Sequence, residues 1–587
     1  MVTVEIQPPP GVHLAESSEG PHHSLMKLLR HFLCLFPLMT LVGCVTSLKP
    51  AAALFAPGEW SATPVVQTAY GVVEGTADTG GTWSWRGIPY AAPPIGELRW
   101  KAPRPPQPWQ GVRRADRFGS SSAQLVPVLG QRGSEDCLYL NVWRPKTADR
   151  MLPVYVFVHG GGNTIGSSDL PDYHGWAVAA RSNMVYVSLN YRLGVFGWFR
   201  SPALGEGESA IDASGNYGTL DIIAALGWVK ANIAAFGGDP STVTVSGESA
   251  GAFNVLSLLV SPQAQGLFQR AVVESGIARM QSTETAERAA RKVTARLLVR
   301  RGKAKDIQAA ETALGAMSHA EVRAFLFSVP TGDFLRVLDK SPVGMAMADH
   351  PTIYADGAVL PSEGFEALRD GSYPNKVPLI IGANKDEARL FMFSSGLYRQ
   401  DPALYDSVAA YRSALWRYAG VDYVARGITS QDGHPPVYAY RFDWGSLNDR
   451  GESPLPRDLG RRLGAFHSTE IPFFLGTGVN SVSFLTGRFL TAANEPGRRV
   501  LTDAVMRYLA AFARTGNPND TVGAPLPAWE PWDPADGGFK ALAMDVDGVA
   551  LQFSALREAP SLASIRAEAP ASAGAGGDMG LLKDIQE

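Results

Sequence analysis

Short runs of apolar residues recur along the chain and alternate with longer stretches in which apolar residues have helical spacing. The runs that we predict as buried strands are Val154 to Val158, Met184 to Leu189, Val243 to Val245, Ala271 to Val273, Val377 to Ile381 and Val437 to Phe442. The helical stretches are Leu220 to Ala235, Glu284 to Leu298 and Leu501 to Ala513. Strands that are apolar along their whole length, separated by helices, indicate a sheet that is buried on both faces. The pattern therefore predicts an α/β fold with a large, mostly parallel central sheet and helices on both faces.

The chain before and after these strands has a different pattern. Gly71 to Gly75 and Trp83 to Tyr90 indicate an N-terminal β-meander. We predict one α/β domain over residues 65–556, although a length of 587 residues would by itself suggest several domains. Residues 557–587 become rich in Ala, Ser and Gly, which predicts a flexible tail.

Residues 1–64 contain three segments of different character. Residues 1–25 are polar and Pro-rich, and they indicate either a disordered extension or an upstream start included by mistake. In residues 26–44 the basic Lys27 and Arg30 precede an apolar run, Phe32 to Val42, that has the length of a signal peptide. Residues 45–64 are predicted to be a linker.

The signal segment ends in Leu-Val-Gly-Cys at residues 41–44. This tetrapeptide resembles the bacterial lipobox, in which the cysteine is lipidated and becomes the first residue of the mature protein. The resemblance implies export of a periplasmic or outer-membrane-anchored lipoprotein, with Cys44 carrying acyl chains that hold it to the bilayer. The alternatives are an ordinary cleaved signal, which gives a soluble secreted protein, and an uncleaved anchor helix.

Charge and cysteine content narrow the classes of function. The formal net charge is −3 and no basic block occurs, so we expect no nucleic-acid partner. Of the three cysteines, Cys34 and Cys44 lie in the signal segment, which leaves Cys137 as the only thiol of the folded body. No intrachain disulfide can form there.

The predicted strand Val243 to Val245 leads directly into residues 247–251, Gly-Glu-Ser-Ala-Gly, and then into an apolar helical pattern. Glycines two positions before and after Ser249 permit a turn that is too sharp for side chains, and such a turn exposes the serine hydroxyl. A strand, a tight turn and a helix in this order predict that Ser249 is a nucleophile. The alternative is a Gly/Ser turn that only packs.

A serine nucleophile needs a base to accept its proton and a carboxylate to orient that base. With this type of turn the chain order is serine, acid, histidine. The strand Val377 to Ile381 is followed by two candidate acids, Asp386 and Glu387, and the local sequence does not decide between them. His467 follows the last predicted strand, where its loop can return to the serine, so it is the predicted base; a surface histidine is the alternative. The other histidines after the serine precede either the acid or the last strand: His319, His350 and His434.

The negative oxygen that forms during attack needs preorganised donors. The turn supplies one, the backbone N–H of Ala250. A second source is residues 159–162, His-Gly-Gly-Gly, which directly follow the strand Val154 to Val158. The alternative for this run, a phosphate-binding loop, lacks the required Gly-Lys-Ser/Thr ending.

Three longer motifs carry a family resemblance. Residues 135–142, Glu-Asp-Cys-Leu-Tyr-Leu-Asn-Val, residues 236–251 and residues 382–387, Gly-Ala-Asn-Lys-Asp-Glu, resemble the type B carboxylesterase family, which includes the cholinesterases. The similarity runs from about residue 65 to about residue 532. It implies an α/β-hydrolase fold, and it implies Ser249 as nucleophile, Glu387 rather than Asp386 as acid, and His467 as base.

The resemblance also implies supporting roles. The N–H groups of Gly161, Gly162 and Ala250 would form the oxyanion hole. Glu248 would face the gorge beside the nucleophile, and Ser275 would support the acid and the histidine by hydrogen bonding.

Two departures from the family pattern change the expectations. In the family the cysteine that matches Cys137 usually forms a disulfide with an upstream cysteine, but Ser122 stands at that place, so we expect a free thiol. The intervening loop is short and has no tryptophan, whereas cholinesterases bind choline on an aromatic face there. Specificity for choline esters is not expected.

The combined prediction is a serine carboxylesterase that hydrolyses neutral, fairly apolar small-molecule esters and requires neither a metal nor an organic cofactor. The alternative from another class is a catalytically inactive binding or adhesion module, since cholinesterase-like proteins include such members. Within the enzymes, a lipase, an amidase or a lactonase stays open. The expected membrane contact is limited to the lipid at Cys44, and no oligomeric state follows from the sequence.

Overall fold

The structure is a computed structural model, and it describes residues 56–126, 129–338, 352–480 and 489–570. The predictions for the disordered start, the signal peptide and Cys44 concern residues 1–44 and lie outside the described residues. The same holds for residues 571–587 of the predicted tail.

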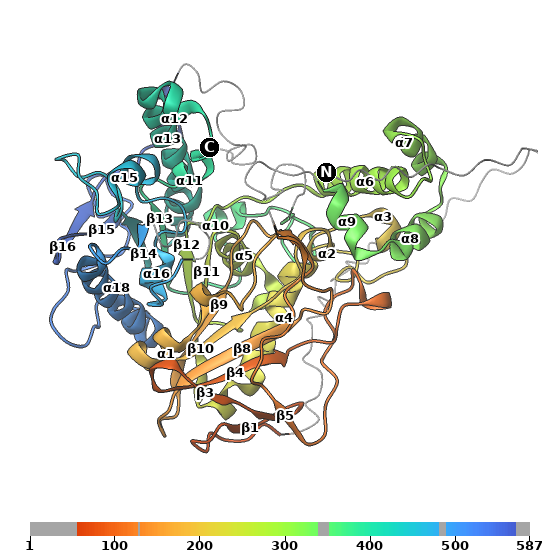
Figure 1. Cartoon of the computed structure of the whole chain (residues 1–587), viewed down its shortest axis with the longest axis horizontal. Helices are drawn as coiled ribbons and strands as arrows, with labels where there is room; N and C mark the ends of the chain where they lie inside the picture. Colours follow the sequence, from red (N-terminus) through yellow and green to blue (C-terminus); the bar gives the residue numbers. More distant parts are fainter. Residues whose placement is uncertain (1–55, 127–128, 339–351, 481–488, 571–587) are drawn as a thin grey trace, which may run out of the picture. The chain divides into compact units, whose positions relative to one another are not determined.

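The described residues form an 11-stranded central sheet (Figure 1). Its strands in spatial order are β16 (Ala550–Leu556), β15 (Ala541–Asp547), β14 (Val437–Phe442), β13 (Leu379–Asn384), β12 (Arg270–Glu274), β11 (Gly238–Glu248), β9 (Leu152–Val158), β10 (Val185–Leu189), β8 (Tyr139–Pro145), β4 (Thr82–Pro89) and β3 (Thr76–Asp78). Neighbours from β15 to β10 are parallel, while β16, β8, β4 and β3 join by antiparallel pairing. The predicted mostly parallel sheet is confirmed, and two strands, β15 and β16, follow the strand that we predicted as the last.

Strand β9 shows how both faces of the sheet are buried. Its three valines pack in one core, whereas its Tyr155 and Phe157 pack in a second core, because successive side chains of a strand point to opposite faces. The helices of the first core include α4 (Tyr217–Asn232) and α5 (Ala250–Val260), and those of the second include α1 (Trp176–Ser182), α16 (Ile471–Phe474) and α18 (Glu495–Thr515) (Figure 1). The stretch Tyr217–Phe236 is apolar and long enough to cross a membrane, and its burial in the core accounts for that composition.

The predicted N-terminal strands are present but divide between two sheets. β1 (Val65–Thr68), β2 (Gly71–Glu74) and β5 (Val112–Arg114) form a separate three-stranded sheet, whereas β3 and β4 extend the central one. A small hairpin of β6 (Gln124–Val126) and β7 (Gly130–Arg132) lies between β5 and β8 in the chain.

The folded domain extends further in both directions than we predicted. Trp60, which we placed in a linker, is 2% exposed, packs edge-on against Trp85 and donates its indole N–H to the Thr147 carbonyl at 3.2 Å. At the other end, helix α19 (Leu562–Ala567) lies in the predicted flexible tail, and its Leu562 and Ile565 are buried in the core. An aromatic or aliphatic side chain with a packing partner keeps each segment in place.

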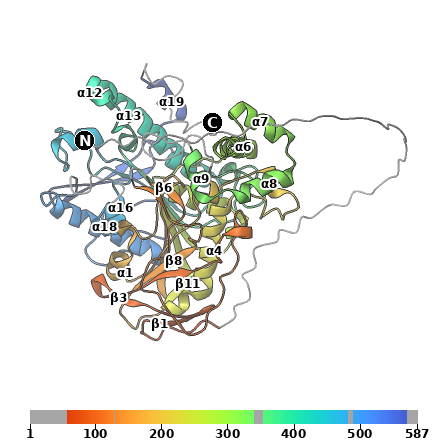
Figure 2. The same ribbon diagram turned by 45° about the vertical axis from the view of Figure 1, so that its right-hand side comes forward.

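Two groups of helices stand apart from each other in both views (Figures 1 and 2). One group is α6 (Thr283–Arg300), α7 (Ile307–Ala316), α8 (His319–Ser328) and α9 (Thr331–Val337); the other includes α11 (Arg389–Met392), α12 (Leu397–Gln400) and α13 (Pro402–Arg417). They are insertions between β12 and β13 and between β13 and β14. The loops of a parallel sheet that follow the carboxyl ends of its strands are where ligands bind, so these insertions border the expected site.

Candidate active site

Ser249 is the single residue that connects β11 to α5. Its backbone has φ 57° and ψ −123°, a conformation that residues with side chains rarely adopt. The glycines around it have no room for a side chain: a Cβ on Gly251 would lie 2.0 Å from the Val158 carbonyl oxygen, and one on Gly247 would lie 2.5 Å from the Gly251 carbonyl carbon. The sharp turn predicted from Gly-Glu-Ser-Ala-Gly is therefore present, and Ser249 is strained.

The glycine loop after β9 lies directly against this turn. A Cβ on Gly160 would be 3.0 Å from the Cβ of Ser249. The backbone N–H groups of Gly161, Gly162 and Ala250 donate to no other group in the described part of the chain. The turn and the loop that contacts it therefore contain three uncommitted N–H groups.

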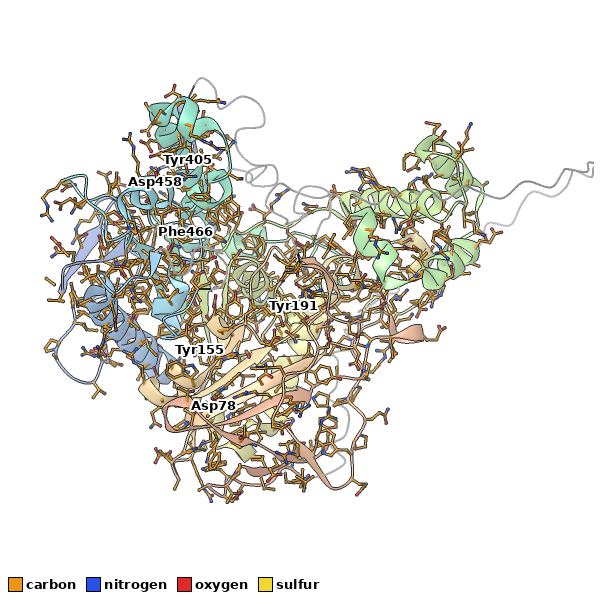
Figure 3. The ribbon with its side chains drawn as sticks, in the orientation of Figure 1. Asp78, Tyr155, Tyr191, Tyr405, Asp458 and Phe466 are labelled. Carbon is orange, nitrogen blue, oxygen red and sulfur yellow. The ribbon has the colours of Figure 1, made fainter. Side chains whose placement is uncertain are left out.

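His159, the first residue of the glycine loop, packs against Tyr191. The Tyr191 hydroxyl donates to the His159 carbonyl at 2.6 Å, and its ring stacks on the imidazole with centroids 4.5 Å apart. Figure 3 shows Tyr191 in the middle of the described domain. Burial lowers the pKa of His159 to about 4, so this imidazole is neutral at ordinary pH. His159 is a structural support for the loop.

The structure brings Glu387 to His467. The Nδ1 of His467 lies 2.5 Å from the Oε2 of Glu387, and both side chains are buried. The other carboxylate oxygen, Oε1, accepts the backbone N–H of Asn384 at 2.8 Å. The rival acid, Asp386, instead accepts the N–H of Ala465 at 3.1 Å and pairs with a nearby arginine. Glu387 is therefore the carboxylate that orients the imidazole.

The second ring nitrogen, Nε2 of His467, has no hydrogen-bond partner among the described residues. It lies 3.4 Å from Oε1 of Glu248, the residue directly before Ser249. The described structure contains no hydrogen bond between Nε2 and the Ser249 hydroxyl. Bonds of this kind are often long until a substrate is bound. The imidazole therefore faces the glutamate that precedes the serine, through a nitrogen that has no hydrogen-bond partner among the described residues.

Ser275 makes a different contact from the one we expected. Its hydroxyl donates to Oε1 of Glu470 at 2.5 Å and not to Glu387 or His467. The other oxygen of Glu470 accepts the side-chain amide of Asn384 at 2.5 Å, and the backbone N–H of Asn384 reaches Glu387. Ser275 therefore acts on the acid only through Glu470 and Asn384. We did not predict Glu470, although it follows His467 by three positions in the same loop.

The comparisons with known proteins agree with this geometry. The model of the carboxylesterase family matches residues 62–413 and 399–552, which is most of the chain. The chain belongs to the carboxylesterase family. The predicted resemblance is confirmed, and the enzyme hydrolyses carboxylic esters.

Among the relatives of this carboxylesterase, the para-nitrobenzyl esterase of Bacillus subtilis is 35% identical over 488 residues, which cover 78% of this chain and 90% of the relative. The fumonisin B1 esterase of Sphingopyxis macrogoltabida is 38% identical over 496 residues, covering 79% of this chain and 84% of the relative. The crystal structure of a carboxylesterase from Geobacillus stearothermophilus superimposes with a TM-score of 0.66 at 32% identity, covering 86% of this chain and 99% of the other. The α/β-hydrolase fold is confirmed.

Four buried glutamates surround the catalytic region of the carboxylesterase: Glu248, Glu274, Glu387 and Glu470. Burial raises the pKa of Glu248 to about 7 and that of Glu470 to about 8, and it raises the pKa of Glu274 well above its ordinary value. Burial also disfavours the charged form of His467, but the neighbouring Glu387 and Glu248 outweigh it and raise its pKa to about 9. The ionisation of Glu248 therefore influences how basic the imidazole is.

Two aromatic rings enclose the imidazole of the carboxylesterase. The centroid of His467 lies 4.9 Å from that of Trp416 and 5.2 Å from that of Phe391, and these two rings stack on each other. The indole N–H of Trp416 donates to the Ser275 carbonyl at 3.2 Å. We did not predict Trp416, which lies far from every sequence motif.

Cys137 is a free, buried thiol, as the carboxylesterase sequence predicts. Burial raises its pKa, so it stays protonated and unreactive. Ser122, at the place of the family's second cysteine, accepts the backbone N–H of Leu193 at 3.0 Å. Ser122 is therefore held at this place by a hydrogen bond to the backbone of Leu193 and not by a cross-link.

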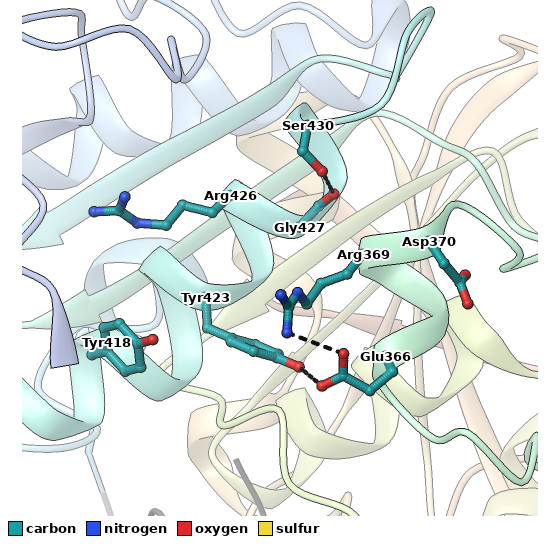
Figure 4. A pocket seen from close by; sticks show the side chains of 8 residues that line it. All are labelled: Glu366, Arg369, Asp370, Tyr418, Tyr423, Arg426, Gly427 and Ser430. Atoms are coloured by element: carbon teal, nitrogen blue, oxygen red, sulfur yellow. Dashed lines mark hydrogen bonds and ion pairs between the residues drawn. The ribbon is translucent and has the colours of Figure 1, made fainter. Parts of the chain in front are cut away.

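A separate cavity of about 580 Å³ lies between α10 (Glu366–Asp370) and α14 (Tyr423–Thr429) (Figure 4). Tyr423 and Arg369 both turn toward Glu366, at 2.6 and 3.2 Å (Figure 4). None of its lining residues belongs to the predicted site.

Proposed function

We propose that this carboxylesterase cleaves neutral, fairly apolar esters through an acyl-enzyme on Ser249. The observation that supports it best is the strained serine set against three uncommitted backbone N–H groups, with the Glu387 and His467 pair beside it. These are the parts that acyl transfer requires: a nucleophile, a base with an orienting acid, and donors for an oxyanion.

In the proposed reaction, Nε2 of His467 accepts the proton of the Ser249 hydroxyl as the oxygen attacks the ester carbonyl. The oxyanion of the tetrahedral intermediate accepts hydrogen bonds from Gly161, Gly162 and Ala250, each worth about 3 kcal/mol in the transition state. The imidazolium then protonates the leaving alcohol, and the acyl-enzyme forms.

Water repeats these steps on the acyl-enzyme. His467 deprotonates the water as it attacks the acyl carbonyl, and the imidazolium then returns the proton to the Ser249 oxygen as the acid leaves. Glu387 accepts the Nδ1 hydrogen throughout and stabilises the positive charge that forms on the ring. Every proton is carried by the chain's own residues.

The preference for neutral, apolar esters rests on the surroundings of the imidazole. Phe391 and Trp416 form an apolar wall there, and the ionisable side chains nearest to His467 are buried carboxyls. Buried carboxyls and aromatic rings disfavour an anionic substrate and favour apolar groups.

Replacing the nucleophile tests this proposal. We expect Ser249→Ala to abolish hydrolysis of a p-nitrophenyl ester and to prevent labelling by an organophosphate, whereas the wild-type enzyme carries the label on the peptide that contains Ser249. The exposed Ser120→Ala is the matched control and should keep both properties. Turnover that survives in Ser249→Ala would refute the acyl-enzyme. A panel of amides, lactones and long-chain esters separates the other hydrolase classes.

We also propose that the enzyme is exported and anchored to a membrane through lipid on Cys44. The support is the basic and apolar segment before Leu-Val-Gly-Cys at residues 41–44. We expect mass spectrometry of the mature protein to find a lipidated N-terminal cysteine, and Cys44→Ala to release esterase activity from the membrane fraction. A mature protein that begins at another residue would contradict the anchor.

A further inference from the structure

The residue after the proposed base has an unusual backbone. Ser468 follows His467 directly and has φ 73°, in the left-handed region that glycine adopts readily and a serine rarely does. It is 2% exposed. Glycine would adopt this backbone conformation without strain, so we expect the serine side chain to make a contact that offsets the strain.

That contact is with Glu248. The Ser468 hydroxyl donates to Oε1 of Glu248 at 2.5 Å. The same oxygen lies 3.4 Å from Nε2 of His467, longer than a well-formed hydrogen bond. Two donors therefore face one carboxylate oxygen, and the serine hydroxyl is the one that binds it.

Glu248 cannot move far from the imidazole, because it is covalently joined to Ser249 and its other oxygen faces Gly160. The other titratable groups that act on Glu248 from the packed elements are Glu387, Glu470, Glu274 of β12, Asp172 and Tyr173 of η3 (Pro171–Tyr173), and Tyr191. All of these groups are acidic or neutral. His467, in contrast, becomes positively charged when it is protonated, so it is the group that can form an ion pair with Glu248.

An ion pair between Glu248 and the imidazolium would interfere with the proposed reaction. The hydrogen on Nε2 would then point at Oε1, while the reaction requires it to point at the Ser249 oxygen and the leaving alcohol. We propose that Ser468 is a positioning residue that occupies Oε1 of Glu248 and so keeps Nε2 of His467 directed at the reacting atoms. This proposal rests on the proposed role of His467 as the base.

The decisive variant is Ser468→Gly, which removes the hydroxyl and suits the left-handed backbone. We expect kcat for a p-nitrophenyl ester to fall about 10-fold with little change in KM, the effect of losing one strong hydrogen bond to a charged group. The acid limb of the profile of kcat/KM against pH should move to higher pH, because a closer Glu248 stabilises the imidazolium. Ser468→Ala should show the same shift, but it keeps the backbone strain of the wild type and so lacks the relief that glycine provides.

A second variant isolates the contact. Glu248→Gln removes the carboxylate, so adding Ser468→Gly to it should produce no further shift of the acid limb. An acid limb that stays in place or moves to lower pH in Ser468→Gly would overturn the positioning role, as would equal shifts with and without Glu248. Failure of the proposed function is distinguishable: there, the wild-type enzyme would carry no organophosphate on Ser249, or His467→Ala would keep its activity.

Discussion

At the scale of single residues, the structure separates two adjacent carboxylates that the local sequence leaves equivalent. Glu387 binds the imidazole at 2.5 Å, while Asp386 accepts the Ser446 hydroxyl at 2.5 Å and the Ala465 N–H at 3.1 Å. Glu387 orients the histidine, whereas Asp386 stabilises the loop that contains the histidine.

This division predicts opposite outcomes for two matched variants. Glu387→Gln should lower kcat by about 10³ to 10⁴-fold, because an amide can neither hold the Nδ1 hydrogen as a carboxylate does nor balance the imidazolium charge. Asp386→Asn should keep kcat within about a few fold and lower the melting temperature, since it loses a charged partner of Arg389. Steady-state kinetics and thermal unfolding of both variants measure this. The reverse pattern would show that Asp386 is the acid.

Other residues of the site could not be predicted from local patterns. Glu470 and Asn384 matter only because the loop after α15 (Arg457–Leu463) brings one to the other, with Asn384 donating to Glu470. Trp416 reaches His467 from the end of α13. The nucleophile, the base and the glycine loop have sequence signatures because their chemistry requires glycines and a chain order, whereas a supporting carboxyl or an aromatic wall requires only proximity.

At the scale of elements, the central strands were predictable because they are buried on both faces and so are apolar at every position. Strand β14 (Val437–Phe442) has the bounds that we predicted. The edge strand β16 alternates between half-buried and exposed residues, so it lacks that signal and was missed together with its partner β15. Helix α19 is short and lies in an Ala- and Ser-rich segment, and it buries two aliphatic residues, Leu562 and Ile565. Strand β16 and helix α19 lie at the border of the core and have too few buried apolar positions to be recognised.

At the scale of the whole molecule, buried acids make folding stability depend on pH. Glu274 is fully buried on β12, where Oε1 accepts the Ser246 hydroxyl at 2.8 Å and Oε2 has no partner in the described structure. Ser246 in turn accepts the Tyr155 hydroxyl at 2.9 Å. Burial raises the pKa of Glu274 well above 4.5, its value in an unfolded chain, so the folded protein keeps a proton there that the unfolded chain loses.

The sign of the effect follows from this difference. Below about pH 4.5 both states are protonated and the stabilising contribution is fully present. As pH rises from there toward the raised pKa of the folded state, the unfolded state binds fewer protons, and the free energy of unfolding falls by about 1.4 kcal/mol per pH unit for one such group. Glu274→Gln stays neutral in both states and does not contribute this slope. We therefore expect its melting temperature to fall less between pH 5 and pH 9 than that of the wild type, by about 2 °C or more. The exposed Glu97→Gln is the control and should follow the wild type; parallel curves for Glu274→Gln and the wild type would mean that Glu274 is ionised in the folded protein.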